Sequence, residues 1–169
     1  MNLYSQIKSL GACPPALDWI EKNPDMTLQE AWDKCPNPRW MVWLLRKSKS
    51  KIETETWQRL AFNIAETVIH LMPIESQECM VEIKKYLDGD TSIDIVAVRK
   101  RSAAAYSAAA YADAAAAYAA DVVAYAAYSA AAAAADAAAA AAADAAADAA
   151  DDAKICNVIR KRFPVAPVL

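Results

Sequence analysis

Hydrophobic residues between Thr54 and Gly89 recur every three or four positions, which is the spacing of an amphipathic helix. Before Pro73, the apolar positions on one face are Trp57, Leu60, Ala61, Ile64, Ala65, Val68 and Leu71. After Ser76, the same spacing continues through Cys79, Met80, Ile83, Tyr86 and Leu87. Because no segment shows the strict alternation of a β-strand, the pattern predicts an all-α fold.

Helix start signals divide the first part of the chain into short helices. Proline in a first turn, capping side chains and capping boxes all mark such starts. They stand at Pro14-Pro15, at Thr27 with Glu30, at Asn37-Pro38, at Thr54 or Thr56, at Ser76, and at Thr91 with Asp94. We therefore predict a multihelix domain over residues 1–90, in which one helix runs from Thr54 or Thr56 to Pro73.

All five tryptophans lie between Trp19 and Trp57. Large aromatic side chains contribute the most buried area, so this concentration predicts the main hydrophobic core. A tryptophan-lined ligand pocket is the alternative interpretation of the same residues.

The composition changes sharply over residues 103–153. Alanine supplies 35 of these 51 residues, and the others are seven Asp, five Tyr, two Ser and two Val. Alanine is the strongest intrinsic helix former, so this tract is expected to be helical. Its methyl side chains allow a neighbouring helix to approach closely, although each methyl buries little area.

After Gly89 the chain has no glycine or proline until Pro164. A single helix from Ile93 to Arg162 would be about 105 Å long and would bury too little area to be held by packing. We therefore expect an antiparallel helical hairpin over residues 91–162, with its turn near Ser129, and a tail at residues 163–169. A homodimer that pairs long single helices is the alternative.

Two basic triplets flank the alanine-rich tract. They are Arg99, Lys100 and Arg101 before it, and Arg160, Lys161 and Arg162 after it. A turn near Ser129 would place the triplets side by side, and their mutual repulsion would then require acidic neighbours or an anionic ligand. Binding of a nucleotide or nucleic acid through the paired triplets is therefore one functional hypothesis.

The tract also predicts a surface for a protein partner. Tyrosines that repeat every seven residues stay on one side of a helix, and aspartates gather on one side of the later part of the tract. A methyl face can then pack inward while an acidic, tyrosine-bearing face points outward. The candidate contact residues on this outer face are Tyr111, Tyr118, Tyr125, Asp136, Asp144 and Asp148.

Several kinds of chemistry are disfavoured. Two glycines are too few for a phosphate-binding loop. His70 is the only histidine, and at the end of an apolar helix a structural role is commoner than that of a catalytic base. The four cysteines lack zinc-site spacing, and Asp144, Asp148 and Asp151 are expected to keep their helix solvated rather than to hold a cation. We expect no catalytic residue, no metal and no cofactor.

Membrane insertion and secretion are not expected either. The longest uncharged run, Val122 to Ala135, has 14 residues and is mostly alanine, whereas a membrane span needs about 20 strongly apolar residues. Widely spaced cysteines without a signal peptide favour free thiols in a reducing compartment. We therefore expect a cytoplasmic protein.

Several segments carry a family resemblance: Gly11-Ala12-Cys13 with Leu17 and Trp19, Trp40-Met41-Val42-Trp43-Leu44-Leu45, Arg59-Leu60-Ala61 through His70-Leu71-Met72, the helix ending near Asp88-Gly89, and the alanine-rich region. Together these segments resemble a family of immunity-like proteins of bacterial polymorphic toxin systems and phages. Members of that family mix arginine with alanine in the tract, whereas this tract contains no arginine. The resemblance implies a non-enzymatic protein that neutralises a toxin or defence protein by stoichiometric binding. We take this as the leading functional hypothesis.

Overall fold

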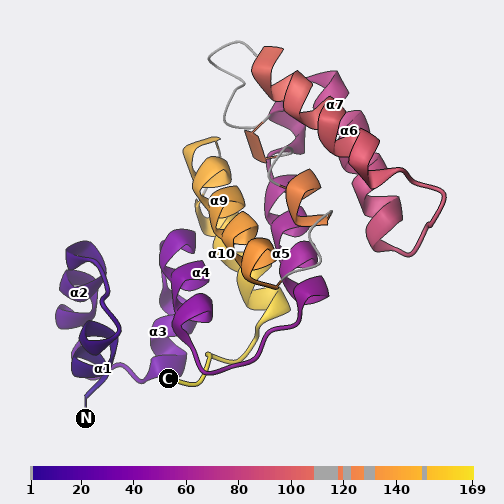
Figure 1. The fold of residues 1–169 in the computed structure, drawn as a ribbon. Coiled ribbons are helices and arrows are strands. Elements are labelled where there is room, and N and C mark those ends of the chain that lie inside the picture. The colour runs from indigo at the N-terminus through magenta and orange to yellow at the C-terminus, as the bar shows by residue number, and fades with distance from the viewer. Residues whose placement is uncertain (1, 109–117, 120–122, 128–131, 150–151) are drawn as a thin grey trace.

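The computed structural model describes residues 2–108, 118–119, 123–127, 132–149 and 152–169 (Figure 1). Its regular elements are all helices, and no strand occurs within these ranges. The predicted all-α class is therefore confirmed. In chain order the elements are α1 (Leu3–Ser9), α2 (Pro14–Glu21), α3 (Leu28–Lys34), α4 (Pro38–Lys47), α5 (Thr54–Glu66), the 3₁₀ turn η1 (Ile69–Leu71), α6 (Ile74–Leu87), α7 (Ile95–Ala108), α9 (Ala132–Ala149) and α10 (Asp152–Arg162).

The helices α2, α3 and α4 begin where the capping signals predict. At the start of α3, the Glu30 amide donates to the Thr27 hydroxyl (3.2 Å) and the Glu30 carboxylate accepts from the Thr27 amide (2.8 Å). These two bonds make the predicted capping box. At the start of α4, the side-chain oxygen of Asn37 accepts from the Arg39 amide at 2.9 Å. Local side-chain chemistry thus determines these helix starts.

One predicted helix is shorter than expected. The apolar stripe predicts a helix that continues to Pro73, but α5 ends at Glu66. The Thr67 hydroxyl donates to the Ile64 carbonyl at 2.7 Å, and the Thr67 amide bonds to the same oxygen at 3.1 Å. Such bonds to the third preceding residue tighten the last turn and end the α-helix. His70 therefore lies in η1 and is exposed.

Two predicted helix starts are displaced. Ser76 is not the cap of α6, because that helix already begins at Ile74, directly after Pro73. Thr91 is not the cap of α7 either. The Asp94 carboxylate accepts from the amides of Val96 and Ala97, each at 3.1 Å. Aspartate is a stronger cap than threonine, which explains the later start.

Helix α6 ends just before Gly89, as this glycine predicts. Gly89 has a φ of +97°, a left-handed conformation that glycine adopts without steric cost. Its amide donates to the Tyr86 carbonyl at 3.0 Å, and the next amide, that of Asp90, donates to the Lys85 carbonyl at 3.0 Å. These bonds satisfy the carbonyls at the end of the helix.

One buried apolar cluster connects residues 1–90 with the alanine-rich region. Helix α9 packs against α5 and α4, while α7 packs along α6 (Figure 1). Leu60 and Ile64 of α5 are fully buried in this cluster. The methyl groups that α9 buries completely are those of Ala139, Ala142, Ala143 and Ala146. The two predicted regions therefore share one core, and these methyls are covered within a single chain.

The described alanine-rich residues lie in three helical stretches. These are the later part of α7, residues 118–119 with 123–127, and α9. Helices α9 and α10 lie side by side and run in opposite directions (Figure 1). The turn expected near Ser129 lies outside the described residues, so the hairpin of residues 91–162 stays a prediction.

The tail after α10 crosses the ends of α3 and α4. The Trp32 indole nitrogen donates to the Phe163 carbonyl at 2.8 Å. Further along, the Ala166 amide donates to the Gln29 side chain at 2.8 Å, and the Lys49 amide donates to the Val168 carbonyl at 3.0 Å. The tail thus connects three elements that are far apart in sequence.

Candidate functional site

A groove of about 330 Å³ lies where the three alanine-rich stretches meet. Side chains from α7 and from α9 contribute to it, together with Tyr118 and Tyr125. Its lining residues are Arg99, Ala103, Tyr118, Tyr125, Ala137, Ala138 and Ala141. Four of these seven are alanines, which leaves space for the aromatic rings and the guanidinium group to form the walls.

Within the groove, Arg99 contacts the ring of Tyr125. The guanidinium carbon of Arg99 lies 4.9 Å from the centre of the Tyr125 ring, within the range of a cation–π interaction. Tyr125 is 42% exposed, while its neighbours Ala124 and Ala126 are completely buried. The burial of these methyls holds the backbone in place and directs the tyrosine outward.

A second aromatic pair extends the groove along α7. The rings of Tyr106 and Tyr118 are 5.1 Å apart between centres and tilted by 46°, a favourable aromatic geometry. Both side chains are exposed. The seven-residue repeat does not select Tyr106, because it stands five positions before Tyr111. Only the packing of α7 on the later segment identifies it.

Two classes of predicted contact residue therefore meet in one place. Arg99 belongs to the first basic triplet, and Tyr118 and Tyr125 belong to the tyrosine repeat. The third member of the repeat, Tyr111, lies outside the described residues. We name the surface formed by Arg99, Tyr106, Tyr118 and Tyr125 the Tyr/Arg surface.

The structure does not bring the two basic triplets together, which corrects the expectation of one basic cluster. Arg101 of α7 forms an ion pair with Glu82 of α6 at 2.6 Å. Arg160 of α10 donates to the carbonyls of Trp32 (3.2 Å) and Cys35 (2.5 Å) at the end of α3. The triplets separate because α7 packs on α6, whereas α10 packs on α4 and α5 (Figure 1).

The remaining members of the triplets lie at the surface. Lys100 and Lys161 are exposed, and Arg162 approaches the Thr56 hydroxyl at 3.5 Å. Arg162 and Lys161 line a groove between α5 and α10 that also contains Glu66 and Val158.

The acidic candidates behave differently from the tyrosines. The Asp144 carboxylate accepts from Arg39 Nε at 2.8 Å, and the Asp144 carbonyl accepts from Arg39 Nη2 at 3.1 Å. Asp144 therefore connects α9 to the start of α4, while its side chain remains exposed as predicted. Asp136 and Asp148 also belong to α9, but their side chains lie outside the described part of the structure.

The cysteines are free thiols, as the spacing predicts. Cys13 is exposed, and the other three are buried. Burial raises the pKa of the Cys35 and Cys79 thiols, which lowers the fraction of reactive thiolate at neutral pH. Within the described ranges, no group of His, Cys, Asp and Glu side chains is arranged to hold a metal ion.

Among the described helices, none combines the length and apolar character needed to cross a membrane. Comparisons of the chain with protein-family models, with curated proteins and with solved structures find no match. The geometry of the Tyr/Arg surface is therefore the main basis for inferring a function.

Proposed function

We propose that this chain is a non-enzymatic binding protein of the immunity or counter-defence type. It would neutralise a toxin or defence protein by stoichiometric binding, with the Tyr/Arg surface as its contact. The observation that carries the proposal is the 4.9 Å stacking of Arg99 on Tyr125 in a groove with an alanine floor. Arginine and tyrosine are enriched among the residues that dominate binding at protein interfaces.

The physical character of this surface suits a protein partner. Tyrosine rings offer a large contact area and lose little conformational entropy on binding, since they have two side-chain torsions. The tilted pair Tyr106–Tyr118 and the stacked pair Arg99–Tyr125 both form within the chain itself. Apolar groups on the partner can contact the rings, and its acidic groups are attracted by the positive charge of Arg99.

The same observations make a nucleotide or nucleic acid a weaker candidate. Recognition of several phosphates requires basic side chains gathered on one surface. Here Arg101 is paired with Glu82, and Arg160 is bonded to backbone carbonyls at the end of α3. The charge that remains is divided between separate parts of the molecule.

The experiment is a capture followed by a functional assay. The tagged full chain is used to isolate proteins from its native host, and a captured protein is then purified and assayed with increasing amounts of the chain. We expect the activity of that protein to be lost at a 1:1 ratio. The double variant Arg99→Ala/Tyr125→Ala should weaken binding by at least about 30-fold, equivalent to about 2 kcal/mol.

The chain supplies a matched control in a second cation–π pair. The Lys8 ammonium lies 5.5 Å from the centre of the Tyr4 ring on α1. Lys8→Ala/Tyr4→Ala removes the same kinds of group and should leave binding unchanged. Equal weakening by both double variants would reject the Tyr/Arg surface as the contact. A captured protein that keeps full activity in the saturated complex would reject the neutralising function.

A further inference from the structure

Positive charge gathers at the end of the molecule where the loop after α4 meets the tail (Figure 1). Residues 34–52 contain six basic residues and no acidic residue. Four of the six lie together at the end of α4 and in the loop that follows it, and all four are exposed: Arg46, Lys47, Lys49 and Lys51. The loop therefore carries a concentrated positive charge that no acidic neighbour in sequence offsets before Glu53.

The tail places apolar side chains beside this loop. The Lys49 amide donates to the Val168 carbonyl at 3.0 Å, and the Lys49 ammonium donates to the Leu169 carbonyl at 2.8 Å. The Val168 side chain is 66% exposed, and Val165, three residues earlier in the tail, is 72% exposed. Because three residues span at most about 11 Å, both valines lie close to the basic loop.

The end of α10 adds two exposed basic residues next to the tail. Lys161 and Arg162 directly precede the tail, and Arg162 approaches the Thr56 hydroxyl at 3.5 Å, in the first turn of α5. Since α5 begins at Thr54, shortly after Lys51, the loop and the end of α10 meet at this helix start. We name the surface formed by these side chains the basic surface: Arg46, Lys47, Lys49, Lys51, Lys161 and Arg162.

The acidic residues of α5 and its cap do not cancel this charge. Glu53 lies 3.8 Å from Lys51, but their side chains are 73% and 89% exposed, so the pair is weak. Glu55 is already bonded to Arg59 at 3.0 Å. That leaves Glu66, which lines the groove beside the end of α10, against the six basic side chains.

The combination of bases and exposed valines favours an anionic lipid bilayer over a nucleic acid. Lysine and arginine are attracted to an anionic lipid surface, and apolar side chains beside them can enter its interfacial region. A nucleic acid would make no comparable use of Val165 and Val168. The basic surface and the tail also contain no exposed aromatic side chain on which the bases of a single strand could stack.

We propose that this end of the molecule binds the surface of an anionic lipid bilayer. The six basic side chains contact the lipid headgroups, and Val165 and Val168 enter the interface beside them. Contact of this kind needs no membrane-spanning helix. It involves none of the residues of the Tyr/Arg surface and goes beyond the proposed binding of a toxin or defence protein.

Co-sedimentation of the full chain with vesicles tests the proposal. The probes are vesicles of phosphatidylcholine alone and vesicles of phosphatidylcholine and phosphatidylglycerol in equal parts. We expect binding only to the vesicles that contain phosphatidylglycerol, and the affinity should fall as the salt concentration rises.

A pair of charge variants tests the basic surface. Lys47→Gln/Lys51→Gln should weaken vesicle binding by about 30-fold, which corresponds to about 1 kcal/mol for each lysine. Neither side chain holds the tail, unlike that of Lys49. The matched control is Lys85→Gln/Lys100→Gln, which removes the same charge from exposed positions on α6 and α7 and should change binding by less than about twofold.

A second pair of variants tests the apolar contact. Val165→Ser/Val168→Ser leaves the backbone bonds of the tail in place and should weaken vesicle binding by at least about fivefold. Val81→Ser/Val96→Ser is the control, because these valines are 53% and 44% exposed on α6 and α7. The proposal is overturned if phosphatidylglycerol vesicles do not bind, if either test variant binds as its control does, or if a single-stranded oligonucleotide binds more tightly than the vesicles.

Discussion

At the scale of single residues, a few long polar side chains join segments that the hydrophobic pattern leaves unrelated. Arg59 of α5 binds the Glu55 carboxylate at 3.0 Å, the Asp88 carboxylate at 3.1 Å and the Leu87 carbonyl. The periodicity predicts the apolar face of α5 correctly, but it carries no information on which distant acid Arg59 will meet. Capping pairs such as Thr27 with Glu30 are predictable, because both partners lie within one helical turn.

The ion pairs of Asp88 predict that the stability of the protein depends on pH. Hydrogen bonds from Lys84 and then Arg59 lower the pKa of Asp88 below its ordinary value. The folded state therefore binds this proton less readily than the unfolded state. The resulting stabilisation is present above the unfolded pKa of about 3.9 and is lost as the pH falls through the folded pKa. We expect the urea midpoint to fall steadily below about pH 4.

The Asp88→Asn variant should have a lower urea midpoint at pH 7, and this midpoint should fall less steeply below pH 4. Part of the fall should remain, since hydrogen bonds with Thr27 and Ser92 also lower the pKa of Glu30 and Asp90. Asp25→Asn, in the exposed loop after α2, is the matched control and should follow the unchanged protein. Parallel pH profiles for Asp88→Asn and the unchanged protein would contradict the assignment.

At the scale of helices, propensity predicts that the alanine-rich tract is helical but not where each helix packs. Alanine methyls are nearly the same on every side, so they do not specify a partner. The apolar stripe of α5 specifies a packing partner, because fully buried Leu60 and Ile64 offer a large apolar face to α9. The Tyr/Arg surface could be predicted in its residue types only. Its assembly depends on α7 meeting the segment with Tyr118 and Tyr125.

The contact between α6 and α7 contains two buried serine hydroxyl groups, and these yield a second prediction. Ser76 and Ser102 are completely buried, and their hydroxyls have no hydrogen-bond partner within the described structure. A buried hydroxyl without a partner costs about 1–3 kcal/mol. Ser102→Ala should therefore raise the free energy of unfolding, measured by urea titration, by about 1 kcal/mol.

The matched control is Ser107→Ala on the same helix. Ser107 is exposed, and its hydroxyl donates to the Ala103 carbonyl at 2.8 Å. Both substitutions change helix propensity equally. The difference between their free energies of unfolding therefore reports on the buried hydroxyl. A Ser102→Ala protein that is less stable than Ser107→Ala would show that the buried hydroxyl is satisfied in solution.

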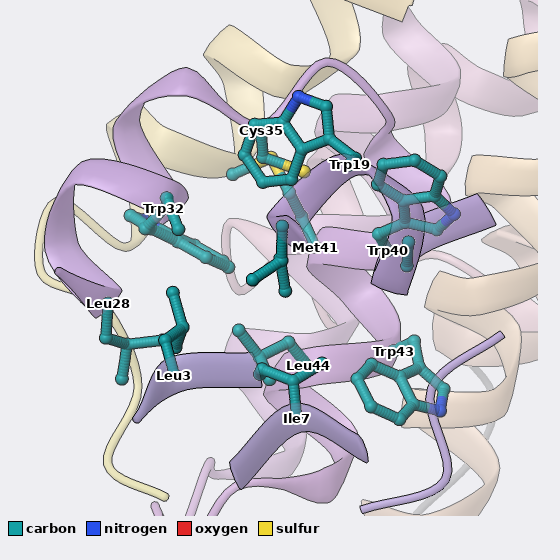
Figure 2. Close-up of a pocket in the computed structure, with 13 residues that line it drawn as sticks. Leu3, Ile7, Trp19, Leu28, Trp32, Cys35, Trp40, Met41, Trp43 and Leu44 are labelled. Carbon is teal, nitrogen blue, oxygen red and sulfur yellow. The ribbon is translucent and has the colours of Figure 1, made fainter. Parts of the chain in front are cut away.

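At the scale of the whole molecule, residues 163–169 fold back onto α3 and the end of α4. The sequence predicts a tail at residues 163–169 but provides no periodic signal for its path. The tail is held by hydrogen bonds to its backbone, including those accepted by the carbonyls of Phe163 and Val168. Such backbone bonds cannot be predicted from the pattern of side chains. It contacts α3, where Trp32 also lines an apolar cavity among α1 to α4 (Figure 2), and it reaches Lys49 after the end of α4.

Removal of residues 163–169 should therefore destabilise the entire protein rather than loosen one end. The deletion removes five hydrogen bonds to the body of the protein: from Trp32 to Phe163, from Gln29 to Pro164, from Ala166 to Gln29, and from Lys49 to Val168 and Leu169. With each bond contributing about 0.5–1.5 kcal/mol, we expect a loss of at least about 3 kcal/mol in urea unfolding. Trp32→Phe removes only the first bond and should lose about 1 kcal/mol. If the shortened chain unfolds at the same urea concentration as the full chain, the tail does not hold α3 and α4 together, and their packing must be maintained by the core alone.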